Sequence, residues 1–168
     1  SKKKELAIIG LGYVGLPLAI EVGKKRNVIG FDINQDRINE LKNNLDSSLQ
    51  VSSKEFEQSI NLNFTNKIDH IKNCKIFIVT IPTPVNDKKK PDLSLLKKGC
   101  EMIGSFIKRD DLVIFESTVY PGVTEEFCAP IIEKRSGLTF NSDFYCGYSP
   151  ERINPGDKNH SISSITKV

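Results

Sequence analysis

Three glycines near the start of the chain have the spacing that proteins use to bind phosphate groups. Residues 10–15 read Gly-Leu-Gly-Tyr-Val-Gly, a GxGxxG pattern that follows an apolar run of strand length and opens a helical pattern. In such a turn Gly10 permits the tight bend, Gly12 lets a pyrophosphate approach the backbone, and Gly15 lets the helix lie close to the sheet. The pattern therefore predicts a site where the first amides of a helix receive phosphates.

A carboxylate stands at the matching place on the next strand. Asp32 lies 22 residues after Gly10, near the end of the apolar run 28–33. There a carboxylate accepts hydrogen bonds from the ribose hydroxyls of NAD and repels the 2′-phosphate of NADP. Glycine turns alone are weak evidence because many are purely structural, but the acid at the expected offset favours a dinucleotide, and NAD in particular.

The elements that must position these residues alternate between strand and helix. Strands are expected at 6–9, 28–33, 62–65, 75–81, 112–115 and 144–148. The run 75–81 is apolar on both faces, which predicts a central strand. The expected buried faces of the helices between them are Gly15, Leu18, Ala19 and Val22; Ile38, Leu41 and Leu45; Phe56 and Ile60; and Leu96, Cys100, Ile103 and Ile107.

The order of these elements predicts the fold. A helix of about four turns between the first two strands requires a crossover, so those strands should be parallel. Asn34 is a suitable N-cap for the second helix, and prolines mark a loop at 83–92 and a turn at 117–122. We expect an α/β fold of the Rossmann type: a doubly wound, mostly parallel sheet with helices on both faces. It should fill 1–168 as one domain, since two would each be small and marginal.

Composition and charge exclude several classes of protein. Hydrophobic residues make up 38% of the chain and charged residues 27%, which is too hydrophobic for a disordered protein. The net charge is +3, and the lysines are scattered beside helix ends and loops, which indicates solvated surfaces and no nucleic-acid stripe. No apolar run approaches the roughly 20 residues that span a bilayer, so we expect a cytoplasmic protein with no membrane partner.

The four cysteines do not form a metal or disulfide pattern. They lie far apart in the sequence and include no CxxC pair, so the expectation is reduced, mostly buried thiols and no metal site. These residues are Cys74, Cys100, Cys128 and Cys146.

Four separated segments carry a resemblance to a known family. They are residues 10–18 (GLGYVGLPL), 81–84 (IPTP), 117–122 (STVYPG) and 149–156 (SPERINPG). In order and spacing they resemble the UDP-glucose/GDP-mannose dehydrogenase family, whose members oxidise the C6 alcohol of a nucleotide sugar to a carboxylate. The fourth segment is most similar to the form in UDP-N-acetylhexosamine 6-dehydrogenases of polysaccharide and capsule biosynthesis. The resemblance implies an NAD-dependent enzyme acting on UDP-N-acetylhexosamine or UDP-glucose.

The resemblance also implies a set of cofactor contacts. Asp32 and Arg37 would hold the adenosine ribose, while Thr83 and Thr118 would contact NAD at two strand ends. Without the family, Arg37 reads as a solvent-facing residue in the first turn of its helix, and each threonine reads as a turn cap. The full set is Gly10, Gly12, Tyr13, Val14, Gly15, Asp32, Arg37, Thr83, Pro84 and Thr118.

Chemistry within this chain is implied at its C-terminal end. The glutamate that matches Glu151 helps to activate the water that hydrolyses a thioester in the family, and Thr118 is the second candidate catalytic residue. Arg152 and Asn154 share the loop with Glu151, and these three would contact the sugar. The plainer alternative is that Glu151 only pairs with Arg152 or with solvent.

The nucleophile of the family is not found in the sequence. Members form the thioester on a cysteine in a GGxCxPxD-type segment well C-terminal to the Rossmann half, and none of the four cysteines here matches it. We therefore expect a truncated chain that lacks the dimerisation helix and the C-terminal substrate domain. Such a chain should bind NAD and not turn over a UDP-sugar, and the whole enzyme should be a homodimer.

Two rival functions are compatible with a GxGxxG domain. One is another NAD-dependent dehydrogenase, of the 6-phosphogluconate or 3-hydroxyacid type, although these lack a PER-type glutamate loop after the sixth strand. The other is a non-catalytic NAD-sensing module, which would explain the missing nucleophile without truncation. The strand-like residues 165–168 argue against it, since a natural domain more often ends in a capped helix or a polar tail.

Overall fold

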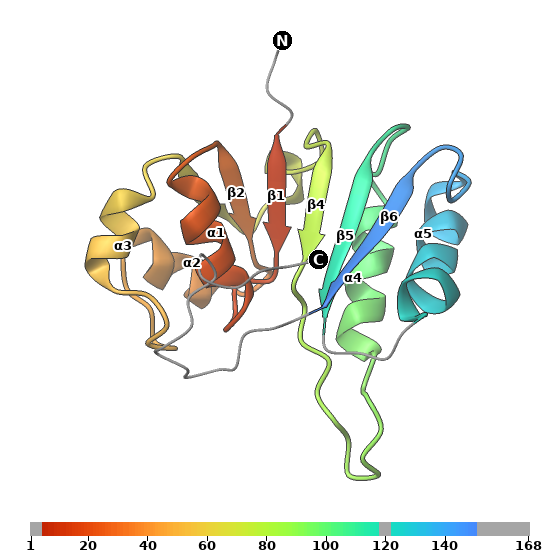
Figure 1. The fold of residues 1–168 in the computed structure, drawn as a ribbon, viewed down its shortest axis with the longest axis horizontal. Coiled ribbons are helices and arrows are strands. Elements are labelled where there is room, and N and C mark those ends of the chain that lie inside the picture. Colours follow the sequence, from red (N-terminus) through yellow and green to blue (C-terminus); the bar gives the residue numbers. More distant parts are fainter. Residues whose placement is uncertain (1–4, 118–121, 151–168) are drawn as a thin grey trace.

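A computed structural model describes residues 5–117 and 122–150, in which six strands alternate with helices (Figure 1). The strands are β1 (Leu6–Ile9), β2 (Val28–Phe31), β3 (Leu62–Thr65), β4 (Ile76–Val79), β5 (Leu112–Ser117) and β6 (Tyr145–Pro150). The helices are α1 (Gly15–Gly23), α2 (Gln35–Lys42), α3 (Ser53–Gln58), α4 (Ser94–Gly104) and α5 (Ala129–Ser136), with a 3-10 turn η1 (Ile68–His70) and a π-helical turn η2 (Thr124–Cys128). None of the helices described is long and apolar enough to cross a bilayer.

The strands form one sheet in the order β3-β2-β1-β4-β5-β6, and every neighbouring pair is parallel. This is the order of doubly wound dinucleotide-binding domains, which confirms the predicted fold class. The order reverses between β1 and β4, where ligands bind in open α/β sheets. In the register, Ile9 stands beside Phe31 on one side and Val79 on the other, so three strands reach the carboxyl edge together.

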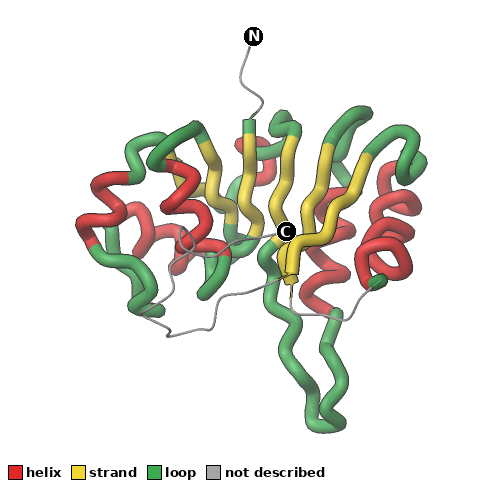
Figure 2. The backbone as a smooth tube through the Cα atoms, in the orientation of Figure 1, coloured by secondary structure: helices red, strands yellow, loops and turns green. Residues whose placement is uncertain are grey.

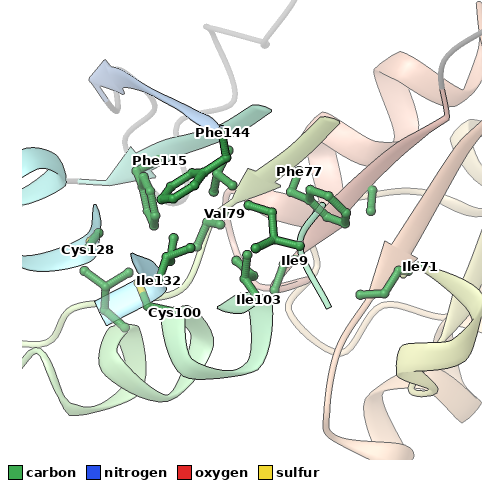
Figure 3. Close-up of a cluster of buried hydrophobic side chains, with 14 of the residues drawn as sticks. Ile9, Ile71, Phe77, Val79, Cys100, Ile103, Phe115, Cys128, Ile132 and Phe144 are labelled. Atoms are coloured by element: carbon green, nitrogen blue, oxygen red, sulfur yellow. The ribbon is translucent and has the colours of Figure 1, made fainter. Parts of the chain in front are cut away.

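Each face of the sheet is covered by its own group of helices, because alternate strand residues point to opposite faces. On one face Ile9 and Val79 pack against Ile103 of α4 and Ile132 of α5 (Figure 3). On the other, Ile8 packs with residues of α1, α2 and α3. Figure 2 shows the helices of the two groups on either side of the strands. The predicted arrangement of helices on both faces is confirmed.

Three details of the predicted helices are wrong. Helix α1 has nine residues, about two and a half turns, and it ends in a tighter turn in which the Lys25 amide bonds to the Val22 carbonyl three residues back. Leu45 is 59% exposed, since α2 ends at Lys42 and the chain turns before it. Ile60 is 81% exposed, and the neighbouring Ser59 is buried in its place.

The buried stripe of α1 also differs from the prediction. Gly15 and Ala19 are buried as expected, but the large residues between the helix and the sheet are Leu16 and Ile20. Leu18 and Val22 are only partly buried at the margin of the same cluster. The helix is therefore rotated slightly about its axis relative to the predicted face.

The cysteines are all free thiols, and Cys74, Cys100 and Cys128 are buried as predicted. Burial raises the pKa of Cys74 to about 11 and that of the partly buried Cys146 to about 12. Figure 3 shows Cys100 of α4 and Cys128 of η2 inside the core under α5. Neutral thiols in apolar surroundings act as packing groups and not as nucleophiles.

Candidate cofactor-binding site

The glycine loop after β1 has the conformation that its sequence predicted. Gly10 has φ +98°, a left-handed conformation that side chains other than glycine rarely adopt. A Cβ on Gly15 would lie 1.7 Å from the Gly10 carbonyl oxygen and 2.4 Å from Thr80 Oγ1. Both glycines are therefore required by the fold, the first by its backbone and the second by the close approach of α1 to the strand ends.

Gly12 differs from the other two glycines because no other described residue crowds it. Within residues 5–117 and 122–150, a Cβ built on Gly12 would have no atom within 4 Å beyond its own chain neighbours. The first intrahelical bond of α1 runs from the Leu16 amide to the Gly12 carbonyl, so the amides before Leu16 have no intrahelical acceptor. Open space in front of unpaired amides at the positive end of a helix fits a phosphate group.

The peptide groups of Leu11, between the two glycines, are held from both sides. Its N–H donates to Asp32 Oδ2 at 3.0 Å, and its carbonyl accepts from Arg37 Nε at 2.9 Å. The second carboxylate oxygen of Asp32 accepts the amide of Asn34 at 2.9 Å, and Asn34 caps α2 as predicted. The loop is thus held in one conformation by bonds within the protein, and such preorganisation lowers the ordering cost of ligand binding.

Arg37 does not face solvent, so that plainer interpretation is wrong. Its side chain is 13% exposed, and its guanidinium bonds to Glu40 and, at 2.9 Å, to Asp46. Burial acts to raise the pKa of Asp46, but hydrogen bonds from Ser48, Arg37 and backbone amides outweigh it and hold the pKa below its ordinary value. In this structure Arg37 therefore positions the glycine loop, and its predicted contact with a ribose stays a prediction.

Thr80 supports the glycine loop, and sequence reasoning missed it. Its hydroxyl donates to the Gly10 carbonyl at 2.6 Å and lies 3.1 Å from the Ile9 carbonyl, so it fastens the glycine loop to the end of β4. Within the sequence Thr80 reads as one more residue of an apolar strand. The signal that was available is its polarity, since a buried hydroxyl must find a partner.

An apolar pocket of about 400 Å³ opens beside Asp32 at the carboxyl edge of the sheet. Its floor comes from the glycine loop and the ends of β1 and β2, and its walls from the segment after β4 and from α4. The apolar side chains that line it are Ile33, Ile81, Pro82, Leu95 and Met102. An apolar pocket next to a carboxylate that is predicted to bind a ribose suits a purine base.

The other predicted cofactor contacts that the structure describes are Tyr13, Val14, Thr83 and Pro84. Val14 is the N-cap of α1 and the neighbouring Tyr13 is exposed, so both border the open space at Gly12. Thr83 and Pro84 follow the pocket wall, where the Pro84 carbonyl accepts the amide of Asp92 at 2.7 Å and closes the loop predicted at 83–92.

Four predicted site residues fall outside the residues that the structure describes: Thr118, Glu151, Arg152 and Asn154. Their roles stay predictions. Among the described residues no group of histidine, cysteine or acidic side chains has the arrangement of a metal site.

The fold and the site together define a Rossmann-type dinucleotide-binding domain: a doubly wound sheet, a preformed glycine loop at the switch point, and an acid at the end of β2. The family profile described as "UDP-glucose/GDP-mannose dehydrogenase family, NAD binding domain" matches residues 4–168. The chain belongs to this family and is an NAD-binding domain.

Relatives and solved structures agree with this membership. The chain is 58% identical over 167 residues to a UDP-N-acetyl-D-glucosamine 6-dehydrogenase of Pseudomonas aeruginosa, covering 99% of the chain and 40% of that protein. It is 50% identical over 165 residues to the protein CapL of Staphylococcus aureus, covering 98% and 39%. The structure of a UDP-D-ManNAc dehydrogenase from Pyrococcus horikoshii matches with a TM-score of 0.79 at 33% identity, covering 90% and 37%. The chain thus spans about 40% of the length of its relatives.

Proposed function

We propose that this chain is the NAD-binding half of a UDP-sugar 6-dehydrogenase, with a UDP-N-acetylhexosamine as substrate. The observation that carries the proposal is the 58% identity, along nearly the whole chain, to a UDP-N-acetyl-D-glucosamine 6-dehydrogenase. Residues 1–168 would form one domain, and the complete protein would be a cytoplasmic homodimer that oxidises the C6 alcohol to a carboxylate. NAD accepts the hydride in each of the two oxidations.

The described residues fit NAD, part by part. The open space at Gly12, in front of the first amides of α1, takes the pyrophosphate. Asp32 accepts the hydroxyls of the adenosine ribose, and the apolar pocket between Ile33 and Leu95 takes the adenine. The rest of the dinucleotide would then lie along the carboxyl edge toward β4 and β5, where Thr83 and Thr118 would contact it.

The chemical roles at the C-terminal end are part of the same proposal. Glu151 would activate the water that releases the acid product, with Thr118 beside the reacting groups. Arg152 and Asn154 would contact the sugar. The thiol nucleophile that the family uses has no match here, so it would come from a part of the protein beyond these residues.

The test uses the complete protein that contains this domain. Mixed with UDP-N-acetylglucosamine and excess NAD, it should produce two NADH for each sugar consumed, because alcohol to carboxylate is a four-electron oxidation. UDP-glucose and UDP-N-acetylmannosamine serve as competing substrates. The 168-residue chain alone should bind NAD and give no NADH. One NADH per sugar, or turnover by the chain alone, would contradict the proposal.

A further inference from the structure

One wall of the apolar pocket contains an unusually close contact between α4 and the segment after β4. Gly99 of α4 is buried, and a Cβ built on it would lie 2.3 Å from Ile81 Cδ1. The next nearest atom is Ile81 Cγ1, at an ordinary 3.8 Å. Only the terminal methyl of Ile81 therefore occupies the space that a side chain at position 99 would need.

Both residues border the pocket, so a change in one alters the space inside it. Ile81 also packs against the core cluster that includes Val79 and Ile103. A methyl group added at position 99 must displace Ile81 Cδ1. The densely packed core leaves no room for the displaced Cδ1 on one side. The open volume that remains for the displaced methyl is the pocket.

We propose that the Gly99–Ile81 contact is a specificity-determining contact that sets the depth of the base pocket. The absence of a side chain at position 99 lets Ile81 lie back against α4, and this leaves a slot for the flat purine of the cofactor. The proposal rests on the placement of adenine beside Asp32 under the proposed function. It adds a residue that neither the glycine motif nor the acid on β2 indicates.

Helix α4 supplies a matched control. Gly104, five residues further along the same helix, is buried against α5, and a Cβ there would lie 2.6 Å from Arg135 Cβ. It does not line the pocket. Gly104→Ala therefore crowds the packing of α4 as Gly99→Ala does, but at a site away from the cofactor.

The experiment measures the affinity of the chain for NAD and for AMP by calorimetry, with folding followed by circular dichroism. Gly99→Ala should weaken both ligands by roughly tenfold or more, the effect of one misplaced methyl group in an apolar pocket. Gly104→Ala should leave both affinities within about threefold of wild type, a change worth about half the 1.4 kcal/mol of a tenfold step. The double variant Gly99→Ala/Ile81→Val removes the displaced methyl and should restore binding to a similar degree.

A size-selectivity measurement keeps the proposal testable if Gly99→Ala folds poorly. Ile81→Ala deepens the slot, so it should favour the bulkier etheno-adenine analogue of NAD. The affinity for NAD divided by the affinity for the analogue should therefore be smaller than in wild type. Unchanged binding in Gly99→Ala, a double variant as weak as the single one, or an unchanged ratio in Ile81→Ala would overturn the inference. Failure of the wild-type chain to bind NAD or AMP would instead contradict the proposed function.

Discussion

At the scale of single residues, Asp32 serves both the fold and the ligand. One carboxylate oxygen accepts the Leu11 amide and the other accepts the Asn34 amide. A carboxylate has about four acceptor positions, so each oxygen keeps capacity for a ribose hydroxyl. The same group therefore holds the shape of the glycine loop and, under the proposed function, would recognise the sugar next to it.

Replacing Asp32 should affect binding more than folding. Asp32→Ala should weaken NAD binding by about 1 to 3 kcal/mol, the range for hydrogen bonds to a charged group. Isothermal titration calorimetry measures the loss, and Asp36→Ala, an exposed acid in the first turn of α2, serves as the control. Equal NAD affinity in wild type and Asp32→Ala would remove this residue from the site.

Thr80 offers a second test at this scale, because its hydroxyl can be removed with little change in shape. Thr80→Val should lower the free energy of unfolding by about 1 to 3 kcal/mol, since the Gly10 carbonyl loses a buried partner. NAD affinity should fall as well, because the loop is less constrained. Thr80→Ser keeps the hydroxyl and should bind NAD like wild type. Identical behaviour of the valine and serine variants would show that the hydroxyl has no role.

Among the structural elements, the segment 46–51 that follows α2 is connected to the glycine loop by hydrogen bonds through Arg37. The Asp46 side chain is 0% exposed, and it accepts the amides of Gln50 and Val51 as well as the Arg37 guanidinium. Arg37 in turn donates to the Leu11 carbonyl. The turn at Asp46 is thereby connected through Arg37 to the glycine loop.

Removing the charge of Asp46 should expose this coupling. Asp46→Asn should destabilise the domain by about 1 to 3 kcal/mol, because the guanidinium keeps Glu40 but its hydrogen bonds, and those of the Gln50 and Val51 amides, lose a charged acceptor. The folded pKa of Asp46 lies below its ordinary value of 3.8, so its contribution is present above that pH and is lost as pH falls through the folded pKa. Urea unfolding at several pH values should show that the gap between wild type and Asp46→Asn narrows below about pH 4. A gap that stays constant from pH 7 to pH 3 would contradict this account.

Most strands and helices could be predicted from the sequence because apolar periodicity reflects burial. The prediction of the buried residue was wrong where a turn decides which of two neighbours faces the core. Strand β4 ends at Val79, short of the predicted 81, because Thr80 turns its hydroxyl toward the glycine loop. Ile60 was expected in the core, but the Ser59 hydroxyl bonds to the Ile20 carbonyl there. Differences of this kind depend on contacts between segments that are distant in the sequence, and apolar periodicity carries no information about such contacts. For the same reason the motif predicted Asp32 and the glycines, but not Asp46 or Gly99.

At the scale of the whole molecule, the chain corresponds to the cofactor-binding part of longer relatives. Those relatives are about two and a half times as long. Under the proposed function, the remainder of the complete protein would bring the thiol and most of the sugar contacts to the carboxyl edge of the sheet. Such a division of the site between two domains would let this chain bind the cofactor without carrying the whole reaction.

The predicted role of Glu151 is testable in the complete protein. Glu151→Gln should leave the hydride transfers largely intact and slow hydrolysis of the acyl-enzyme by about 10² to 10⁴, the usual contribution of a general base. A burst of NADH and an added mass on a cysteine in intact-protein mass spectrometry should follow. Steady turnover at the wild-type rate, with no adduct, would leave Glu151 with a surface role only.

If the glycine loop and Asp32 select NAD over NADP, calorimetric titration of the 168-residue chain with both cofactors should show it. NAD and NADP differ by one phosphate on the ribose that Asp32 is placed to contact. The account predicts that NAD binds at least roughly tenfold more tightly than NADP, which corresponds to about 1.4 kcal/mol. Equal affinities, or tighter binding of NADP, would contradict it.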